Sequence, residues 1–287
     1  MMNAKDLSTL LKPKIAFLNV LTGVAGYVLA GGEGVRLLFF IVAGFLTAMG
    51  SGAVNHYLDR DIDARMQRTA DRPIPKRRIK PSEALLIGMG MIVSGVMLSL
   101  LTLTPLATFF IALGAFIYLV IYTMWLKRRT VWNIVIGGAA GSCPPLAGWA
   151  AVTNSIDLIP VLLAFLIFLW TPGHFWGLAI RAERDYRRAG IPMLPAVAGI
   201  ERASFVTGLS NMITVAVWFA IGLLLQNPLF YFIITTPLTV LLAKDSVKLM
   251  MKPEKETAWR VFKTSSPWLM IIVVGALASL ISFPSPF

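Results

Sequence analysis

Residues 37–63 read LLFFIVAGFLTAMGSGAVNHYLDRDID, an apolar run that ends in the densest group of carboxylates in the chain. The run from about 37 to 57 is long enough to cross, as a helix, the roughly 30 Å hydrocarbon core of a bilayer. A charged side chain at the centre of a bilayer costs roughly 2.5–3.5 kcal/mol on insertion scales, so it is kept where it binds something or reaches water. This stretch therefore predicts a membrane helix that ends in a site for a cation and a phosphate.

Apolar runs of this kind recur along the whole chain. Its 287 residues are 57% hydrophobic and only 14% charged, whereas soluble globular proteins carry about 25% charged residues. The sequence predicts an all-α integral membrane protein with one domain over residues 1–287, built as a bundle of nine transmembrane helices. The expected spans are about 15–32, 37–57, 83–103, 105–125, 132–151, 158–180, 204–225, 228–246 and 267–284.

The basic residues predict the orientation of this bundle. All Lys and Arg residues except Arg36 fall in the N-terminal tail or in every second loop. Because cytoplasmic loops are enriched in Lys and Arg, we expect the N-terminus in the cytoplasm and the C-terminal residues 282–287 outside. The two long cytoplasmic loops, about 58–82 and 181–203, are the expected active-site loops. Topology, anionic lipid and phosphate binding then account for the net charge of +12 without a nucleic-acid partner.

The carboxylate group has the spacing of a ligand row. Asn55, Asp59 and Asp63 are four residues apart, so in a helix they share one face. At 1.5 Å per residue the row covers about 12 Å, near the width of a metal-bridged diphosphate. Oxygen ligands of this kind suit Mg²⁺, which takes one or two carboxylates together with substrate phosphates and water. Asp61 should face away and be solvated or ion-paired.

Basic side chains continue the same spacing. Arg68, Arg72 and Lys76 follow the carboxylates at steps of four, and Lys127 and Arg128 reach the same side of the membrane from another loop. Guanidinium groups match phosphate oxygens in pairs, so these five residues are candidates for binding a diphosphate. The alternatives are salt bridges within a cytoplasmic helix and the general excess of positive charge on that side.

A second polar cluster lies at the end of the predicted helix 158–180. His174 and then Asp185 stand there much as His56 and the first carboxylates stand at the end of helix 37–57. These are the only two histidines of the chain, and the helices run in the same direction. The correspondence favours a weak parallel repeat with two half-sites that face one cavity. A histidine that bridges two helices is the alternative.

Aromatic side chains accompany both clusters. Tyr57 follows His56, and Trp170, Phe175 and Trp176 surround His174 in the sequence. Aromatic faces stabilise a cation without attacking it, which suits an allylic carbocation. Ordinary packing or a belt of tryptophan at the membrane surface is the alternative for each ring.

The motif Asn55-x-x-x-Asp59-x-x-x-Asp63 in a nine-helix bundle resembles the intramembrane prenyltransferase superfamily. Residues 170–176 (WTPGHFW), Asp185-Tyr and residues 189–195 (AGIPMLP) resemble, within it, the protohaem IX farnesyltransferase (haem O synthase) family. The resemblance covers residues from about 12 to 284. The first motif alone specifies the superfamily, and the segment 170–195 selects the haem branch.

The resemblance implies a reaction. A farnesyl group would pass from farnesyl diphosphate to the C2 vinyl group of haem b, with addition of water, to give haem O and diphosphate. Mg²⁺ is the implied cofactor, held by Asp59 and Asp63 through the diphosphate that Asn55 orients. His56 and His174 are implied haem contacts or axial ligands. The cations that would neutralise the leaving group are Arg68, Arg72, Lys127 and Arg128.

Several expectations accompany this interpretation. The bilayer surrounds the chain, and contact with a haem A synthase or a terminal oxidase is the expected protein partnership. The short N-terminus without a presequence indicates a bacterial plasma membrane. One departure from many relatives is that Glu183 and Asp185 are only two residues apart and do not share a helical face, so a second complete Mg²⁺ site is not expected, although Asp185 remains a candidate.

Two other classes of protein stay open at this stage. An aromatic, quinone-type polyprenyltransferase would share Asn55, Asp59 and Asp63 and differ in the segment that contains His174. A secondary transporter would place ionisable residues near the middle of the bilayer. The carboxylates here cluster at the cytoplasmic end, which counts against transport.

Overall fold

The computed structural model describes residues 3–281, and every regular element in that range is a helix. The predicted outward end of the chain, residues 282–287, lies outside the described residues. The helices are α1 (Ala4–Leu11), α2 (Pro13–Leu29), α3 (Val35–Leu58), α4 (Arg60–Arg65), α5 (Pro81–Thr102), α6 (Pro105–Phe116), the π-helix η1 (Ile117–Leu126), α7 (Asn133–Gly137), α8 (Ala139–Thr153), α9 (Leu158–Arg181), α10 (Glu183–Ala189), α11 (Leu194–Leu224), α12 (Pro228–Met251) and α13 (Lys255–Ala278).

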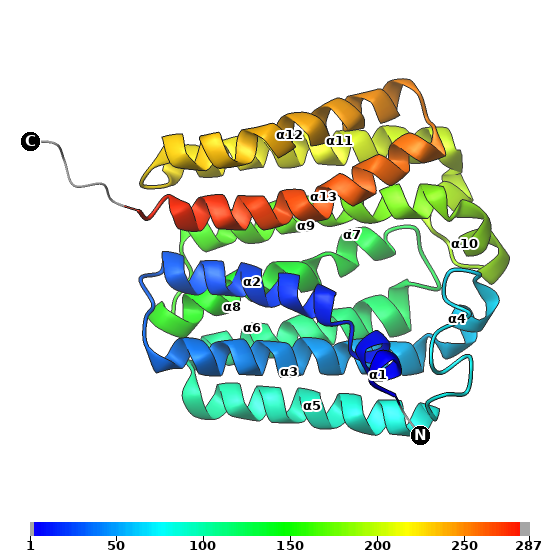
Figure 1. Cartoon of the computed structure of the whole chain (residues 1–287), viewed down its shortest axis with the longest axis horizontal. Coiled ribbons are helices and arrows are strands. Elements are labelled where there is room, and N and C mark those ends of the chain that lie inside the picture. The colour runs from blue at the N-terminus through cyan, green and yellow to red at the C-terminus, as the bar shows by residue number, and fades with distance from the viewer. Residues whose placement is uncertain (1–2, 282–287) are drawn as a thin grey trace, which may run out of the picture.

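The long helices run back and forth through one bundle (Figure 1). Eight of them are long and apolar enough to cross a membrane, counting α6 with η1 and α7 with α8 as one each. These eight overlap the predicted spans from the second to the ninth, so the expected all-α membrane protein is confirmed. Two bounds were wrong: α11 begins ten residues and α13 twelve residues before the predicted span. The first predicted span falls on α2, which is also apolar but has only 17 residues, about 25 Å of helix.

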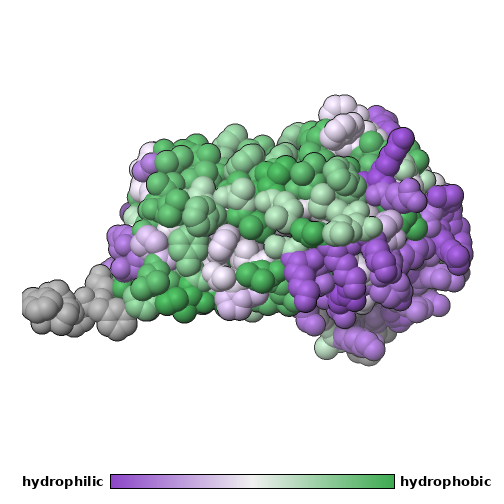
Figure 2. Space-filling view, turned by 90° about the horizontal axis from the view of Figure 1, so that it is seen from above, coloured by the Kyte–Doolittle hydropathy of each residue, from purple (hydrophilic) through white to green (hydrophobic). Residues whose placement is uncertain are grey.

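Polar and apolar surfaces are separated along the bundle. Figure 2 shows hydrophilic side chains gathered at one end of the molecule and hydrophobic side chains over most of the rest. Leu86, Leu101 and Met251 are 76–78% exposed, and soluble proteins rarely expose apolar surface on such a scale. Lipid is the solvent that matches this surface. Figure 1 places the short helices α1, α4 and α10 at the polar end.

Helices α2 and α8 pack backbone against backbone. A Cβ atom added to Gly148 would lie 1.8 Å from the carbonyl oxygen of Gly23, and one added to Gly26 would lie 2.2 Å from that of Pro145. Small residues allow this close approach, which is how helices associate tightly where lipid offers no hydrophobic driving force. We call this contact between α2 and α8 the seam. It fixes the position of α2, and of Lys12 directly before it, relative to the rest of the bundle.

Candidate active site

The carboxylate row is built on two helices instead of the one that its spacing suggests. Helix α3 ends at Leu58, Asp59 has φ −92° and ψ 2°, and α4 begins at Arg60. The helix on which the spacing argument rested is therefore interrupted at Asp59. The hydrogen bonds from Asp59 N to Asn55 O (2.9 Å) and from Asp63 N to Asp59 O (2.8 Å) still continue through the break, so the three residues keep their helical spacing.

Asp59 is buried, 1% exposed, and only one of its oxygens is paired. Lys127 Nζ lies 2.6 Å from Oδ2, and Asn55 Nδ2 donates to the same oxygen at 2.8 Å. The other oxygen, Oδ1, is buried and has no hydrogen-bond partner among the described residues. An unsatisfied buried acceptor costs about 1–3 kcal/mol, more when it is charged, so this oxygen fits an incoming cation.

Asp63 is equally buried and is held by an arginine. Arg72 Nη1 lies 2.9 Å from Oδ1 and 2.7 Å from Oδ2. No group of three or more His, Cys, Asp or Glu side chains able to hold a metal occurs within residues 3–281. Two carboxylates and a substrate that supplies further oxygens are the donor set that Mg²⁺ commonly uses, and Asp59 and Asp63 fit that description.

Lys12 joins this group, and the sequence did not predict it. Its Nζ donates to Asn55 Oδ1 at 2.6 Å and to the Tyr118 hydroxyl at 3.3 Å. Burial, with the nearby charge of Arg72 adding to it, lowers the pKa of Lys12 to about 7. Its backbone is left-handed, with φ 51°, which is uncommon for a residue other than glycine. The one local signal was Pro13, because the residue before a proline avoids the helical region.

The π-helix η1 supplies one wall of the site. Tyr118 contacts Lys12, Thr123 accepts from Asn55 Nδ2 at 3.0 Å, and Lys127 pairs with Asp59. In an α-helix at 100° per residue, Lys127 would lie about 180° away from Tyr118. Hydrogen bonds from i to i+5 put more than four residues in each turn, so nine residues complete about two turns. The π-winding therefore brings these side chains to one side.

The remaining predicted cations occupy other positions. Lys76 pairs with the exposed Asp71 at 3.1 Å. Arg128 binds both oxygens of Asp61 at 2.6 and 2.8 Å, and this hydrogen bonding lowers the pKa of Asp61. Asp61 is thus ion-paired, as expected. The structure brings Arg72 to Asp63 and Lys127 to Asp59. Lys76 and Arg128 pair with other carboxylates, outside this group. We call Asn55, Asp59 and Asp63, with Lys12, Arg72 and Lys127, the carboxylate centre.

The loops that follow the two polar clusters in the sequence contact each other. The backbone N–H of Arg68 donates to Asp185 Oδ2 at 3.1 Å. Ile62 of α4 belongs to the same buried cluster as Tyr186 of α10 and Trp176 of α9. Burial raises the pKa of Tyr186, and the Arg68 guanidinium beside it opposes that rise. Asp185 therefore positions the segment after the first carboxylates and does not form a second row of ligands.

His174 lies in a stack of rings between α9 and α13. Its ring is stacked on Trp170 at 4.4 Å and on Phe262 at 4.5 Å, and Phe262 stacks on Trp259 at 5.1 Å. The His174 Nδ1 atom lies 2.6 Å from the Ser265 hydroxyl oxygen. We call Trp170, His174, Phe262 and Trp259 the aromatic ladder. Its α13 members were missed because nothing in the sequence relates them to α9.

The other predicted haem or prenyl contacts are spread more widely. His56 is 1% exposed, and its Nδ1 has no hydrogen-bond partner among residues 3–281. Trp176 is also buried, and its Nε1 has no hydrogen-bond partner in that range either. Phe175 packs on the cluster that contains Trp176. Tyr57 packs on another cluster, beneath the guanidinium of Arg60 at 4.4 Å. Trp170 thus lies in the aromatic ladder, whereas Phe175 and Trp176 share one buried cluster and Tyr57 packs on another.

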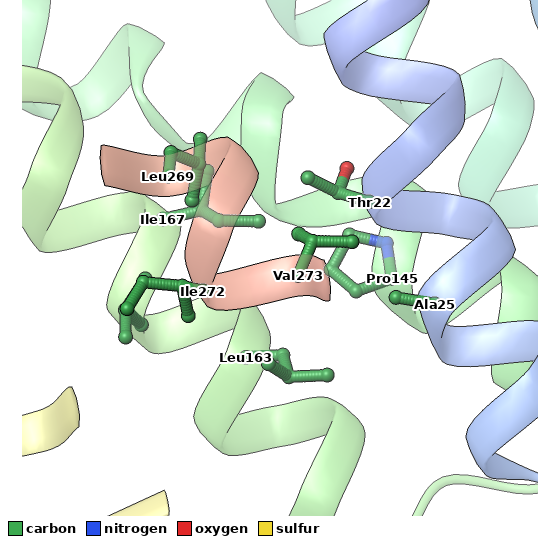
Figure 3. Close-up of a pocket in the computed structure, with 9 residues that line it drawn as sticks. Thr22, Ala25, Pro145, Leu163, Ile167, Leu269, Ile272 and Val273 are labelled. Atoms are coloured by element: carbon green, nitrogen blue, oxygen red, sulfur yellow. The ribbon is translucent and has the colours of Figure 1, made fainter. Parts of the chain in front are cut away.

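A small apolar pocket lies deeper in the bundle, between α2, α8, α9 and α13 (Figure 3). Its volume of about 10 Å³ is close to the minimum that holds one water molecule. Thr22 is its one polar lining residue, and the Thr22 hydroxyl donates to Asn19 O at 2.8 Å. The other lining residues are Ala25, Pro145, Leu163, Leu166, Ile167, Leu269, Ile272 and Val273. The lining of this pocket is thus almost entirely apolar.

Comparison with known proteins places the chain in a family. The model of the UbiA prenyltransferase family matches residues 19–280. "Protoheme IX farnesyltransferase 1" of Cenarchaeum symbiosum is 40% identical, over 100% of this chain and 99% of that protein, and a protoheme IX farnesyltransferase of Gluconacetobacter diazotrophicus is 42% identical over 96% and 91%. A UbiA homologue from Archaeoglobus fulgidus, solved with DMAPP and Mg²⁺, has a TM-score of 0.69 at 14% identity, over 95% of this chain and 99% of that chain.

Proposed function

Because this chain belongs to the UbiA prenyltransferase family, we propose that it transfers the farnesyl group of farnesyl diphosphate to the C2 vinyl group of haem b. Water adds in the same reaction, and the products are haem O and diphosphate. The observation that carries this proposal is the carboxylate centre, joined to relatives of about 40% identity that are named protoheme IX farnesyltransferases.

The carboxylate centre would bind the diphosphate end of the prenyl substrate. Asp59 and Asp63 would hold Mg²⁺, which supplies charge neutralisation and orientation to the leaving diphosphate. Support comes from the unpartnered Oδ1 of Asp59 and from the related fold solved with Mg²⁺. Lys12, Arg72 and Lys127 are already within hydrogen-bond reach of the amide and carboxylates. Each would exchange that partner for a phosphate oxygen and stabilise the developing negative charge.

The haem and the prenyl chain would lie on the apolar side of this centre. The aromatic ladder offers flat faces that suit a porphyrin and stabilise an allylic cation. His56, Tyr57, Phe175 and Trp176 remain predicted contacts of haem or prenyl chain, and Arg68, Lys76 and Arg128 remain predicted contacts of the diphosphate. For Lys76 and Arg128 this requires that they leave the ion pairs described above.

We also propose nine membrane spans within a single domain over residues 1–287, with α2 as the short first span. Its apolar composition and its packing on α8 support this. The Lys- and Arg-rich end would then face the cytoplasm and the opposite end the outside. A plasma membrane is the proposed location. The bacterial assignment stays a prediction, since the similar proteins come from archaea as well as bacteria. Contact with a haem A synthase or terminal oxidase also stays a prediction.

The test incubates the purified protein with haem b, farnesyl diphosphate and Mg²⁺ and follows farnesylated haem by mass spectrometry. We expect product that disappears on chelation and falls by roughly 100-fold or more in Asp59→Asn, because a ligand of the Mg²⁺ that would stabilise the leaving diphosphate is lost. Asp157→Asn is the matched control, since Asp157 is exposed in the connection between α8 and α9 and its side chain only caps α9, which asparagine also does. Prenylation of 4-hydroxybenzoate without any reaction of haem would instead support an aromatic prenyltransferase.

A further inference from the structure

The His174 ring is fixed on three sides. Trp170 covers one face with an interplanar angle of 12°, and Phe262 covers the other with 26°. Ser265 contacts Nδ1 at 2.6 Å. With both faces covered, another group can approach the ring only along its plane. The edge that remains is the one that carries Nε2.

The hydrogen bonds around Ser265 determine which nitrogen carries the proton. The Ser265 hydroxyl donates to the carbonyl oxygen of Phe262 at 2.9 Å, and a hydroxyl has only one hydrogen to donate. With that hydrogen assigned to Phe262, the Ser265 oxygen is the acceptor towards His174, and the hydrogen of the neutral ring is assigned to Nδ1. Trp170 Nε1 donates to the Ser265 carbonyl oxygen at 2.9 Å and holds this arrangement. Nε2 is left with its lone pair.

Nothing else in the described chain uses that lone pair. No hydrogen bond to Nε2 occurs within residues 3–281, and His174 is half-buried, so the edge is accessible. His56 differs in each respect. It is 1% exposed, no aromatic ring is stacked on it, its Nδ1 has no partner in the same range, and it follows Asn55 directly in the carboxylate centre.

We propose that Nε2 of His174 is the axial ligand of the iron in the haem substrate, and that Ser265 is the positioning residue that fixes its tautomer. Neutral imidazole is a common ligand of haem iron. A metal-bound histidine usually donates its other N–H to a fixed acceptor, which orients the ring. The Ser265 hydroxyl is such an acceptor, and this assignment rests on the proposed function because haem is the ligand that it supplies.

The test titrates ferric haem into the full-length protein in detergent and records optical and electron paramagnetic resonance spectra. Wild-type protein should give the spectrum of histidine-ligated haem. His174→Gly should lose it, and added imidazole should restore it by entering the vacated space. His174→Ala should behave like His174→Gly before imidazole is added. Ser265→Ala should keep the ligand but weaken haem affinity by roughly tenfold, as is typical when the partner of a metal-bound histidine is removed.

His56→Ala tests the other histidine and should keep the spectrum of histidine-ligated haem, because that spectrum reports the axial ligand. Loss of the histidine signature in His56→Ala, with retention in His174→Gly, would assign the ligand to the other histidine and overturn the inference. The inference would also be overturned if both variants kept the wild-type haem spectrum and still transferred the farnesyl group. Failure of the wild-type protein both to bind and to farnesylate haem would refute the proposed function itself.

Discussion

At the scale of single residues, the carboxylate centre is a set of buried carboxylates and half-buried cations that already pair with one another. Asp59 pairs with Lys127 and Asp63 with Arg72, while Lys12 donates to the neutral Asn55. A buried charge is tolerated only when it is paired and hydrogen-bonded. Lys12 is the exception, since its nearest partner is an amide and its pKa is lowered to about 7 by burial. An anionic ligand would supply the missing counter-charge.

Lys12→Gly separates the role of this amine from that of its backbone. Glycine adopts the left-handed conformation without the roughly 1–2 kcal/mol that other residues require, so thermal stability should stay equal or rise. A charged hydrogen bond contributes about 1.5–3 kcal/mol, so KM for farnesyl diphosphate should rise roughly 10- to 100-fold. Kinetics at varied diphosphate concentration measure this. Lys14→Ala, at an exposed position, is the control, and an unchanged KM in Lys12→Gly would remove Lys12 from the site.

The sequence predicted part of this centre and missed the rest for a physical reason. Asn55, Asp59 and Asp63 are related by local helical spacing, which a sequence displays directly. Lys12 contacts Asn55 across 43 residues and Tyr118 across 106. No local pattern encodes such contacts, since they depend on how α2 and η1 pack. His174 was predicted by its neighbours, but Ser265, 91 residues later, was not.

At the scale of helices, the spans were predictable and their irregularities were not. Apolar length and flanking charge located the spans, because a bilayer imposes both. The break of α3 at Asp59 and the π-winding of η1 left no trace in hydropathy. The segment 117–126 is apolar on every side, so it has no periodicity that would reveal more than four residues per turn. Yet that winding brings Tyr118, Thr123 and Lys127 together.

The seam between α2 and α8 makes a prediction at this scale. Gly148→Ala would place a methyl group 1.8 Å from the Gly23 carbonyl oxygen, and overpacking of this kind costs typically 1–3 kcal/mol. Thermal unfolding in detergent should shift to lower temperature, and transfer activity should fall because Lys12 moves with α2. Gly90→Ala, where no atom lies within 4 Å, should be neutral or slightly stabilising by helix propensity. Equal stability of the two variants would contradict the close seam.

At the scale of the whole molecule, the bundle has its polar side chains at one end and an apolar, lipid-compatible surface over most of the rest (Figure 2). The carboxylate centre, both long loops and the start of α13 lie at the polar end, and the opposite end has only short connections (Figure 1). Diphosphate is soluble in water, whereas the prenyl chain and the porphyrin are largely apolar. A site at the polar end of an apolar bundle can receive both kinds of ligand at once.

The proposed orientation can be measured with single cysteines. The native Cys143 is buried, at 4% exposure, and is replaced by alanine to give a background without reactive thiol. Gln67→Cys lies in the loop at the polar end, and Ser155→Cys lies in the connection between α8 and α9; both positions are exposed. An impermeant maleimide should label Gln67→Cys only in inside-out vesicles and Ser155→Cys only in right-side-out vesicles. The reverse labelling pattern would show that the protein has the opposite orientation in the membrane. Labelling of both variants from the same side would show that the number of spans between the two positions differs from the proposed one.

The Ser265–His174 contact has a consequence for how the protein is made. During translation Asp63 is followed by Arg72 within nine residues, and Asp59 receives Lys127 after 68. A nascent chain thus contains every charged residue of the carboxylate centre once Lys127 has been added. Ser265 belongs to α13, the last helix in the order of the chain within residues 3–281. A nascent chain that stalls before α13 therefore has every charged group of the carboxylate centre. It still lacks the Ser265 hydroxyl that orients His174.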